Sequence, residues 1–347
     1  MLFHVKPPFK LHFKIVTVLL IMALTACSSE KKPDPKPPEA QKDYVTLTYS
    51  EYATTENEGD IQTQIMSYDP ATKKLEDVFA FDYTAQYPLG FYDRKSQKVY
   101  YTQKVGTDTA YGDQIFVRDL AKQETTQLTD HLFAVNYMIA SGNQLFFVAN
   151  VKGEQAIRLG ALDLQTKKMK LWGDADMLVE AMTLDAETQK VYVSAYSLKQ
   201  RNYSLTHQDG PAGQNNFKMP EYTVYETDFA LEEKKKLFSK KQWLRMLMNK
   251  EGHIIAFGDQ EYNKGQIPST VIDYDLDSEK YAESKWKSKR LQRGEANYSG
   301  DARKIYALAI LNNERGLVEY DTEADRFTPI FMPKEGFINN MQVVKGQ

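Results

Sequence analysis

From residue 43 onwards the chain is a succession of short apolar segments separated by short polar turns. One pattern recurs, in which a polar turn such as 96–98 precedes three or four apolar or aromatic residues such as 99–102. Its copies begin at Val99, Leu145, Val191, Ile254 and Ile305, with spacings of 46, 46, 63 and 51 residues, and an earlier copy without its turn begins at Tyr44. Segments of this length between turns predict β-strands.

A second pattern recurs with the same period as the first. In each copy a strand ends in an aspartate, and a charged turn follows the aspartate. Its copies contain Asp69, Asp119, Asp163, Asp228, Asp275 and Asp321. An aspartate in this position can accept hydrogen bonds from its own turn, and lysine-rich tips suit solvent-exposed hairpins. We therefore interpret these residues as turn formers and not as a catalytic ring.

A third apolar segment precedes the copies of the first pattern, as at 87–92, 133–139, 177–184 and 243–248. Together the patterns give six units of four strands, at about 51 residues each, which predicts an all-β, six-bladed β-propeller. Three strands within 44–81 and a last strand at 337–344 would form one shared blade, so the N-terminal strands plus the C-terminal strand would close the ring. A two-sheet sandwich is the alternative, but it does not explain a sixfold period.

The segment 298–306, Tyr-Ser-Gly-Asp-Ala-Arg-Lys-Ile-Tyr, resembles the turn and strand of the WD40-like repeats in TolB-type propellers. Those repeats carry a Ser-Pro-Asp-Gly-Lys-like turn before an apolar strand. The resemblance covers residues 43–347 as architecture, although five of the turns lack the Pro-Asp pair. It implies a domain that binds other proteins and has no fixed active site.

The N-terminus has the three parts of a secretory signal. Lysines lie at positions 6, 10 and 14, an apolar run covers 15–24, and Leu24-Thr25-Ala26-Cys27 resembles the lipobox of bacterial lipoproteins. We expect residues 1–26 to be a signal peptide and Cys27 to carry the lipid, palmitate included. The protein would then be extracytoplasmic and anchored to the cell membrane, or to the outer membrane of a Gram-negative cell. An uncleaved anchor or a plain signal peptide are the alternatives.

Residues 27–42 follow the lipobox and contain four prolines, several charges and almost nothing apolar. Such a segment cannot bury enough surface to fold, and proline keeps it extended. We interpret it as a disordered tether that would hold the propeller, residues 43–347, roughly 40 Å from the bilayer.

Charge and cysteine content narrow the possible partners. Removal of the three signal lysines leaves 41 basic against 47 acidic residues, and this mildly acidic balance gives no support for nucleic-acid binding. Cys27 is the only cysteine, so the core must hold without disulfides. We expect a monomer.

Catalytic motifs are missing from the sequence. It contains no Gly-x-Ser-x-Gly elbow, Gly-rich phosphate loop, His-Glu-x-x-His or Cys-x-x-Cys, so we assign no catalytic residues and expect no enzyme. Aromatic and charged residues instead gather in loops that we expect on or beside one face. The residues of this candidate binding face are Tyr52, Tyr83, Tyr111, His131, Trp172, Asp174, Asp176, Tyr203, His207, Trp243, Tyr262 and Arg293.

The insertion 197–220 accounts for the spacing of 63 residues and is polar. Long loops in compact domains are usually functional or disordered. It would project over the candidate binding face, either as a binding or lid element or as a tolerated excursion.

Two acidic clusters could attract Ca²⁺, namely Asp273, Asp275 and Asp277, and the pair Asp174 and Asp176. The first has the spacing of calcium loops but lacks the glycine and glutamate that complete them, and its alternate carboxylates would equally suit solvent. No metal ligand is assigned, and Ca²⁺ stays the one cofactor considered.

The function that these features favour is a membrane-anchored propeller that binds or scaffolds a protein partner in the cell envelope. One alternative is a sensor of a small molecule or ion. Another is an envelope enzyme, such as a lyase, lactonase or glycan hydrolase, that uses the funnel with Asp130, His131, Asp174, Asp176 and Arg293.

Overall fold

The structure is a computed structural model that describes residues 42–52, 61–83, 85–107, 111–206, 219–259, 270–285 and 295–346. Residues Gln41–Gln347 form one compact unit, and every strand named below belongs to it.

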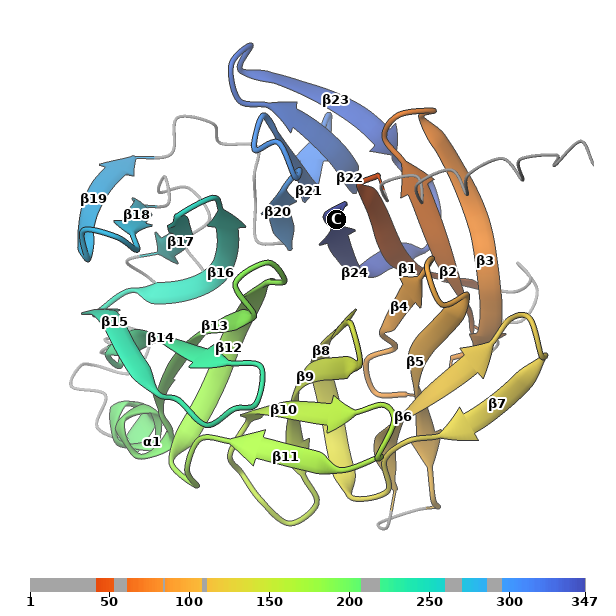
Figure 1. Cartoon of the computed structure of the whole chain (residues 1–347), viewed down its shortest axis with the longest axis horizontal. Helices are drawn as coiled ribbons and strands as arrows, with labels where there is room; N and C mark the ends of the chain where they lie inside the picture. Colours follow the sequence, from red (N-terminus) through yellow and green to blue (C-terminus); the bar gives the residue numbers. More distant parts are fainter. Residues whose placement is uncertain are drawn as a thin grey trace, which may run out of the picture. The chain divides into compact units, whose positions relative to one another are not determined.

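The strands form six sheets of four antiparallel strands, arranged as the blades of a propeller (Figure 1). In each blade the first strand lies innermost and the fourth outermost. Blade 1 consists of β24 (Phe337–Val344), β1 (Tyr44–Tyr52), β2 (Ile61–Asp69) and β3 (Lys74–Asp82). Blade 2 consists of β4 (Gly90–Asp93), β5 (Lys98–Val105), β6 (Gly112–Asp119) and β7 (Glu124–Gln127).

The other four blades, like blade 2, each consist of four consecutive strands. Blade 3 contains β8 (Leu132–Ser141), β9 (Gln144–Val151), β10 (Arg158–Asp163) and β11 (Met169–Trp172). Blade 4 contains β12 (Met177–Asp185), β13 (Lys190–Ser197), β14 (Tyr222–Asp228) and β15 (Lys235–Lys240). Blade 5 contains β16 (Trp243–Lys250), β17 (His253–Asp259), β18 (Thr270–Asp275) and β19 (Lys280–Lys285). Blade 6 contains β20 (Ala296–Tyr298), β21 (Lys304–Leu311), β22 (Glu314–Asp321) and β23 (Arg326–Phe331). The predicted six-bladed all-β propeller is confirmed.

Blade 1 combines strands from the two ends of the described chain. β24 pairs antiparallel with β1, from Tyr44 opposite Val344 to Ser50 opposite Phe337. Just outside this pair, the carboxylate of Asp43 accepts the backbone N–H groups of Gly300 (2.6 Å) and Gly346 (2.8 Å). The start of β1 is therefore tied both to blade 6 and to the second residue after β24.

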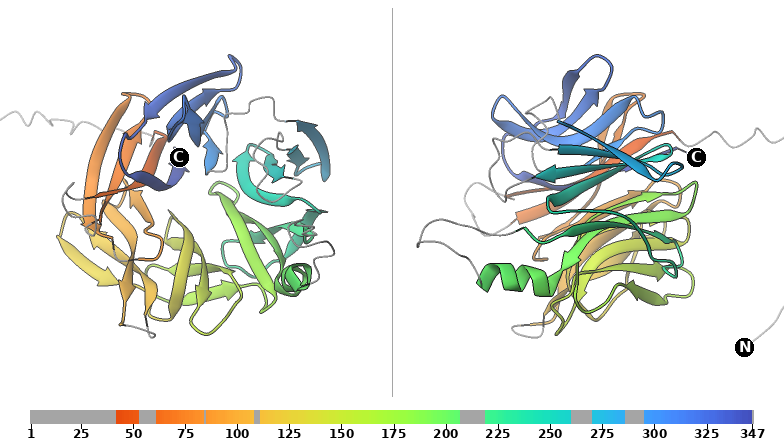
Figure 2. Two further views of the ribbon diagram at one scale, coloured as in Figure 1. Left: turned by 180° about the vertical axis from the view of Figure 1, so that it is seen from behind. Right: turned by 90° about the vertical axis from the view of Figure 1, so that its left-hand side faces the viewer.

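The propeller has two faces. The turns between first and second strands and between third and fourth strands lie at one end, called here the hairpin face. The connections between second and third strands and between successive blades lie at the other end, called here the loop face. The helix α1 (Leu198–Thr206) projects from the loop face, whereas the C-terminus lies at the hairpin face (Figure 2).

The six predicted turn aspartates accept backbone hydrogen bonds within their own turns. Asp163, for example, accepts the N–H groups of Gln165 (2.9 Å) and Thr166 (2.7 Å), and these bonds hold its pKa below the ordinary value. The same role belongs to Asp69, Asp119, Asp228, Asp275 and Asp321. The interpretation of these residues as turn formers is confirmed.

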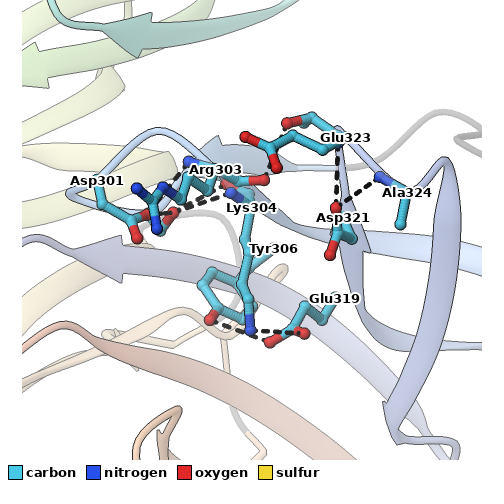
Figure 3. Close-up of polar contacts among 10 residues, drawn as sticks. Asp301, Arg303, Lys304, Tyr306, Glu319, Asp321, Glu323 and Ala324 are labelled. Atoms are coloured by element: carbon cyan, nitrogen blue, oxygen red, sulfur yellow. Dashed lines mark hydrogen bonds and ion pairs between the residues drawn. The ribbon is translucent and has the colours of Figure 1, made fainter.

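The turn that begins β21 shows how side chains join neighbouring strands of blade 6 (Figure 3). Asp301 accepts the N–H of Arg303 (3.1 Å) and so holds the turn. Lys304 donates to the carboxylate of Glu319 on β22 (2.9 Å), and the hydroxyl of Tyr306 donates to the same carboxylate (3.3 Å). The polar ends of β21 and β22 are thereby fixed to each other.

Apolar packing between blades forms the core. Residues 145–148 of β9 are fully buried because neighbouring blades cover both faces of the sheet. Between blades 1 and 2 the approach is so close that a Cβ atom on Gly90 would lie 1.5 Å from Cδ1 of Ile65. A side chain at position 90 would therefore force the two blades apart.

The insertion 197–220 differs in part from the expectation of an irregular loop, because its first half is α1. Ser197 caps the helix by accepting the N–H of Gln200 (3.1 Å). Residues 207–218 lie outside the described part of the chain. Among the described residues, no helix is long and apolar enough to span a membrane.

Candidate functional site

Four of the predicted aromatic residues lie at the loop face. Tyr52 ends β1, Tyr83 and Tyr111 lie in connections, and Tyr203 lies on α1. Tyr52 and Tyr203 are 56% and 63% exposed. Tyr83 packs edge-on against Phe337, with ring centroids 6.3 Å apart, and Tyr111 packs against Phe133. Two of these tyrosines therefore expose more than half of their side chains, whereas the other two contribute to ring packing in the loops.

Exposed apolar side chains concentrate on the same face. Seven large hydrophobic residues are exposed in the described part of the chain. Tyr52, Tyr87, Tyr203, Leu205 and Phe337 lie at the loop face, whereas Met169 and Tyr281 lie on the outer strands β11 and β19. Exposed aromatic residues are favoured at protein recognition surfaces. We call these five residues the loop-face cluster.

The polar candidates at this face have different surroundings. His131 and Asp130 face each other at 3.6 Å, and both side chains are 75% exposed. Asp174 accepts the N–H of Asp176 (2.9 Å). Asp176 in turn accepts the hydroxyl of Ser197 (2.7 Å), and this bond lowers the pKa of the carboxyl. Asp176 therefore anchors the start of α1.

The two tryptophan candidates do not lie on an exposed face. Trp172 is 5% exposed, and its indole N–H donates to the backbone carbonyl of Glu233 in the next blade (2.9 Å). It therefore packs between blades 3 and 4 and presents little surface to a partner. Trp243 lines the central channel, where its indole N–H donates to the carboxylate of Glu180 (2.8 Å).

The remaining candidates cannot be placed. His207, Tyr262, Arg293 and the lipidation candidate Cys27 all lie outside the described residues.

The carboxylates of the proposed calcium loop at 273–277 form contacts within the protein. Asp273 lies 2.7 Å from Nδ1 of His253 on β17, and Asp275 accepts the turn N–H groups of Asp277 and Ser278. In the described part of the chain, no group of three or more His, Cys, Asp or Glu side chains is placed to hold a metal ion.

The innermost strands enclose a central channel of about 1390 Å³. Polar residues from all six blades line its wall. We single out one from each blade, on the innermost strand or up to three residues before it. In blade order these residues are Asn339, Tyr87, Tyr137, Glu180, Arg245 and Glu295. We call them the channel ring. None of these six residues was predicted from the sequence, although an ionisable residue inside an apolar segment, such as Glu180 within 177–184, was a usable signal.

Two carboxyl groups of the ring lie in low-polarity surroundings. Burial raises the pKa of Glu295 to about 8, although the backbone N–H of Met341 donates to its carboxyl. Burial also raises the pKa of Glu180, against the effect of the hydrogen bond from Trp243. At neutral pH, Glu295 therefore holds its proton in the absence of a cation.

The other ring residues differ in whether their polar atoms form hydrogen bonds. Arg245 donates from Nε to the carboxylate of Asp259 (2.6 Å). The hydroxyl of Tyr87 donates to the backbone carbonyl of Asn339. The side chain of Asn339 is 2% exposed, and its Oδ1 accepts no hydrogen bond within the described structure. One buried acceptor in the ring is thus left without a partner.

Polar residues also lie at the hairpin end of the channel. The ammonium of Lys345 donates to the backbone carbonyl of Asn249 (2.9 Å) and to its side-chain oxygen. Oδ1 of Asn297 accepts the N–H of Asn249 (3.3 Å). Burial lowers the pKa of Lys345. The residue after β24 thereby joins blade 5 across the end of the channel.

No family model matches the sequence, and no curated protein matches it. Solved structures are similar to it in fold. The crystal structure of TolB from Acinetobacter baumannii is 14% identical with a TM-score of 0.54, and the match covers 87% of this chain and 66% of that one. This chain therefore spans less than two thirds of that TolB chain.

Two other structures give the same result. A chain of the nidogen/laminin complex is 10% identical with a TM-score of 0.54, over 86% of this chain and 98% of that one. The β-propeller domain of the Trilobed protease from Pyrococcus furiosus is 11% identical with a TM-score of 0.52, over 84% and 82%. At these identities the similarity shows the fold alone, which agrees with the TolB-like architecture predicted from the repeats.

Proposed function

We propose that this protein is an extracytoplasmic lipoprotein whose propeller binds a protein partner in the cell envelope through its loop face. The loop-face cluster is the observation that carries the proposal. Its five exposed side chains lie at one end of the propeller in two groups, with Tyr52, Tyr87 and Phe337 around blade 1 and Tyr203 and Leu205 on α1 of blade 4. Exposed aromatic residues are common anchors of protein interfaces.

The direction in which the chain begins also supports this proposal. Asp43, directly before β1, lies at the hairpin face. A lipid on Cys27, joined through the proline-rich tether, would therefore connect to the face opposite the cluster. The loop face would then be free to meet a partner.

The similar structures are compatible with protein binding, since one of them was solved as part of a nidogen/laminin complex. The described residues offer little for the enzyme alternative. Asp130 and His131 are exposed, and Asp176 is engaged with α1. Protein binding is therefore the function that we propose.

Crosslinking in intact cells tests the proposal. The full-length protein would be crosslinked and the bound proteins identified, with Cys27→Ala as the unanchored control. We expect one dominant envelope protein, and its recovery should fall at least tenfold in the double variant Tyr203→Ser, Leu205→Ser on α1, because both side chains are exposed apolar contacts.

A matched control removes apolar surface elsewhere. The variant Tyr281→Ser, Met169→Ser loses two exposed side chains from outer strands and should keep the partner. Equal loss of the partner in both double variants, or no specific partner under several growth conditions, would contradict a loop-face interface.

A further inference from the structure

The two carboxyl groups of the channel ring lack a cationic partner. Neither Glu180 nor Glu295 forms an ion pair with another described residue; Trp243 donates to the first and the Met341 N–H to the second. Each of these contacts uses one carboxyl oxygen. Buried carboxylates are ordinarily paired, because an isolated buried charge is costly.

In the described structure, the basic residues near these carboxyl groups form their hydrogen bonds and ion pairs with other residues. Arg245 is held by Asp259, and Lys345 by Asn249 at the hairpin end of the channel. Arg315 and Arg201 act on Glu295 and Glu180 only through longer-range electrostatics, and both are exposed. The negative charge that either carboxyl group acquires on losing its proton is therefore not offset by direct contact with a basic residue within the described structure.

Two further groups in the ring point to a ligand that donates hydrogen bonds. Oδ1 of Asn339 is a buried acceptor without a partner. Tyr137 lines the channel, and no contact in the described structure engages its hydroxyl. Both add acceptor capacity to that of the two glutamates.

The walls of the channel suit a molecule that is partly apolar. Tyr87, Tyr137 and Trp243 offer aromatic surfaces, and Ile139, Leu247 and Met341 also line the cavity. Aromatic faces attract ammonium groups, and apolar walls accept methylene segments. A compact metal ion would use neither feature.

We propose that the central channel is a binding site for a small organic cation with separated ammonium groups, such as a linear polyamine. Its ammonium groups donate to Glu180, Glu295 and Oδ1 of Asn339, and its methylene chain lies along the apolar wall. The bound cation keeps both carboxylates charged and supplies them with the positive partner that Arg245, paired with Asp259, does not provide. This site shares only Tyr87 with the loop-face cluster, and the variants that test the two sites leave Tyr87 unchanged, so each can fail without the other.

Spermidine is the probe for this site. Binding would be measured by calorimetry on the full-length protein purified in detergent, at pH 7.5 and constant ionic strength. We expect saturable binding at one site. Glu180→Gln and Glu295→Gln should each weaken it about tenfold or more, because each removes one charge-assisted contact while keeping the side-chain shape.

The control variant is Glu124→Gln on the outer strand β7, an exposed position away from the channel, and it should bind like the wild type. Should a glutamine variant fail to fold, as judged by its melting curve without ligand, Tyr137→Phe supplies a milder test. It removes one hydroxyl and should weaken spermidine binding several-fold.

Three results would overturn the proposal. The first is no binding of spermidine by the wild type at millimolar concentration. The second is binding that both glutamine variants and Tyr137→Phe leave unchanged. The third is saturable binding of a neutral sugar such as glucose in place of spermidine, which would assign the channel to polyhydroxylated ligands.

Discussion

Acidic residues have two opposite environments in this protein, and position in the blade decides which. The aspartates at hairpin turns are exposed and accept backbone N–H groups, which lower the pKa of residues such as Asp163 and Asp321. The glutamates of the channel ring are enclosed by six blades, and burial raises their pKa. The charged aspartates stabilise their turns, whereas Glu180 and Glu295 destabilise the folded propeller when they are charged and no cation is bound.

Replacement of Asp228 tests the structural role of the turn aspartates. Its carboxylate accepts the N–H groups of Glu232 (2.7 Å) and Glu233 (3.2 Å). Asp228→Ala should lower the free energy of unfolding by about 1 kcal/mol, because two turn hydrogen bonds lose their acceptor. Urea denaturation measures this loss. Asp228→Asn keeps an oxygen in place and should lose less; an equal loss would mean that charge and not the hydrogen bonds matters.

The second residue-scale prediction concerns pH. Folding raises the pKa of Glu295 from about 4.5 to about 8, so between these values the folded state holds a proton that the unfolded state has released. Stability should therefore be fully present below about pH 4.5 and fall as pH rises towards 8, by an amount on the order of a few kcal/mol at most. Denaturation curves from pH 5 to 9 measure it.

Glu295→Gln provides the comparison for this titration, because glutamine is neutral at every pH and can still accept the Met341 N–H. The variant should keep the pH dependence of the other groups, including Glu180 and Asp113, whose pKa burial also raises. The difference between the two proteins isolates position 295. Parallel curves for wild type and variant would show that Glu295 does not titrate in this range.

At the scale of elements, strands and turns followed from the sequence because they depend on local patterns. The predicted strand at 337–344 coincides with β24, and the aspartate turns occur where the repeats placed them. α1 was not predicted, since it buries only Ser204 and has no apolar stripe. Its start is held by Asp176, which lies 21 residues before Ser197 in the chain, so the contact that fixes it is tertiary.

The buried side of β24 should contribute strongly to stability. Met341 is 2% exposed and packs with Ile338 and Val343, whereas Phe337 on the same strand is exposed. Met341→Ala should lower the free energy of unfolding by about 2–5 kcal/mol through lost packing and a cavity. Phe337→Ala should change it by no more than about 0.5 kcal/mol. Guanidinium denaturation of both variants checks the contrast, and similar losses would contradict it.

At the scale of the whole molecule, the repeat period predicted the circle of blades and the loop face that they share. It did not predict the six residues of the channel ring. The channel ring joins one residue from each blade, and no spacing pattern specifies which innermost position points to the axis. Trp172 shows the same limit, since a loop-flanking position in sequence became a contact between blades. Local periodicity determines how many blades form and which residues belong to each. Which side chains meet in the channel depends on the length and tilt of each innermost strand.

Anchoring is the prediction that belongs to this scale. Cys27→Ala should move the protein from the membrane fraction to the soluble extracytoplasmic fraction, because the lipid has no attachment site. The melting temperature of the propeller should stay unchanged, since residues Gln41–Gln347 form a compact unit of their own. Cell fractionation and a thermal melt measure both. Unchanged membrane retention would favour an uncleaved N-terminal anchor.

The shared blade also sets a kinetic order for folding. Asp43 and Gly346 are hydrogen-bonded although 303 positions separate them. Bringing such distant segments together costs roughly 4 kcal/mol more chain entropy than closing a four-residue turn, so blade 1 should be the last to assemble and the one that limits the refolding rate. Until β24 arrives, β1 keeps an unpaired edge to which another chain can add. A circular permutant that joins residues 346 and 43 and opens between Asp130 and His131, in the connection between blades 2 and 3, makes every blade continuous in sequence and should refold faster with less aggregation.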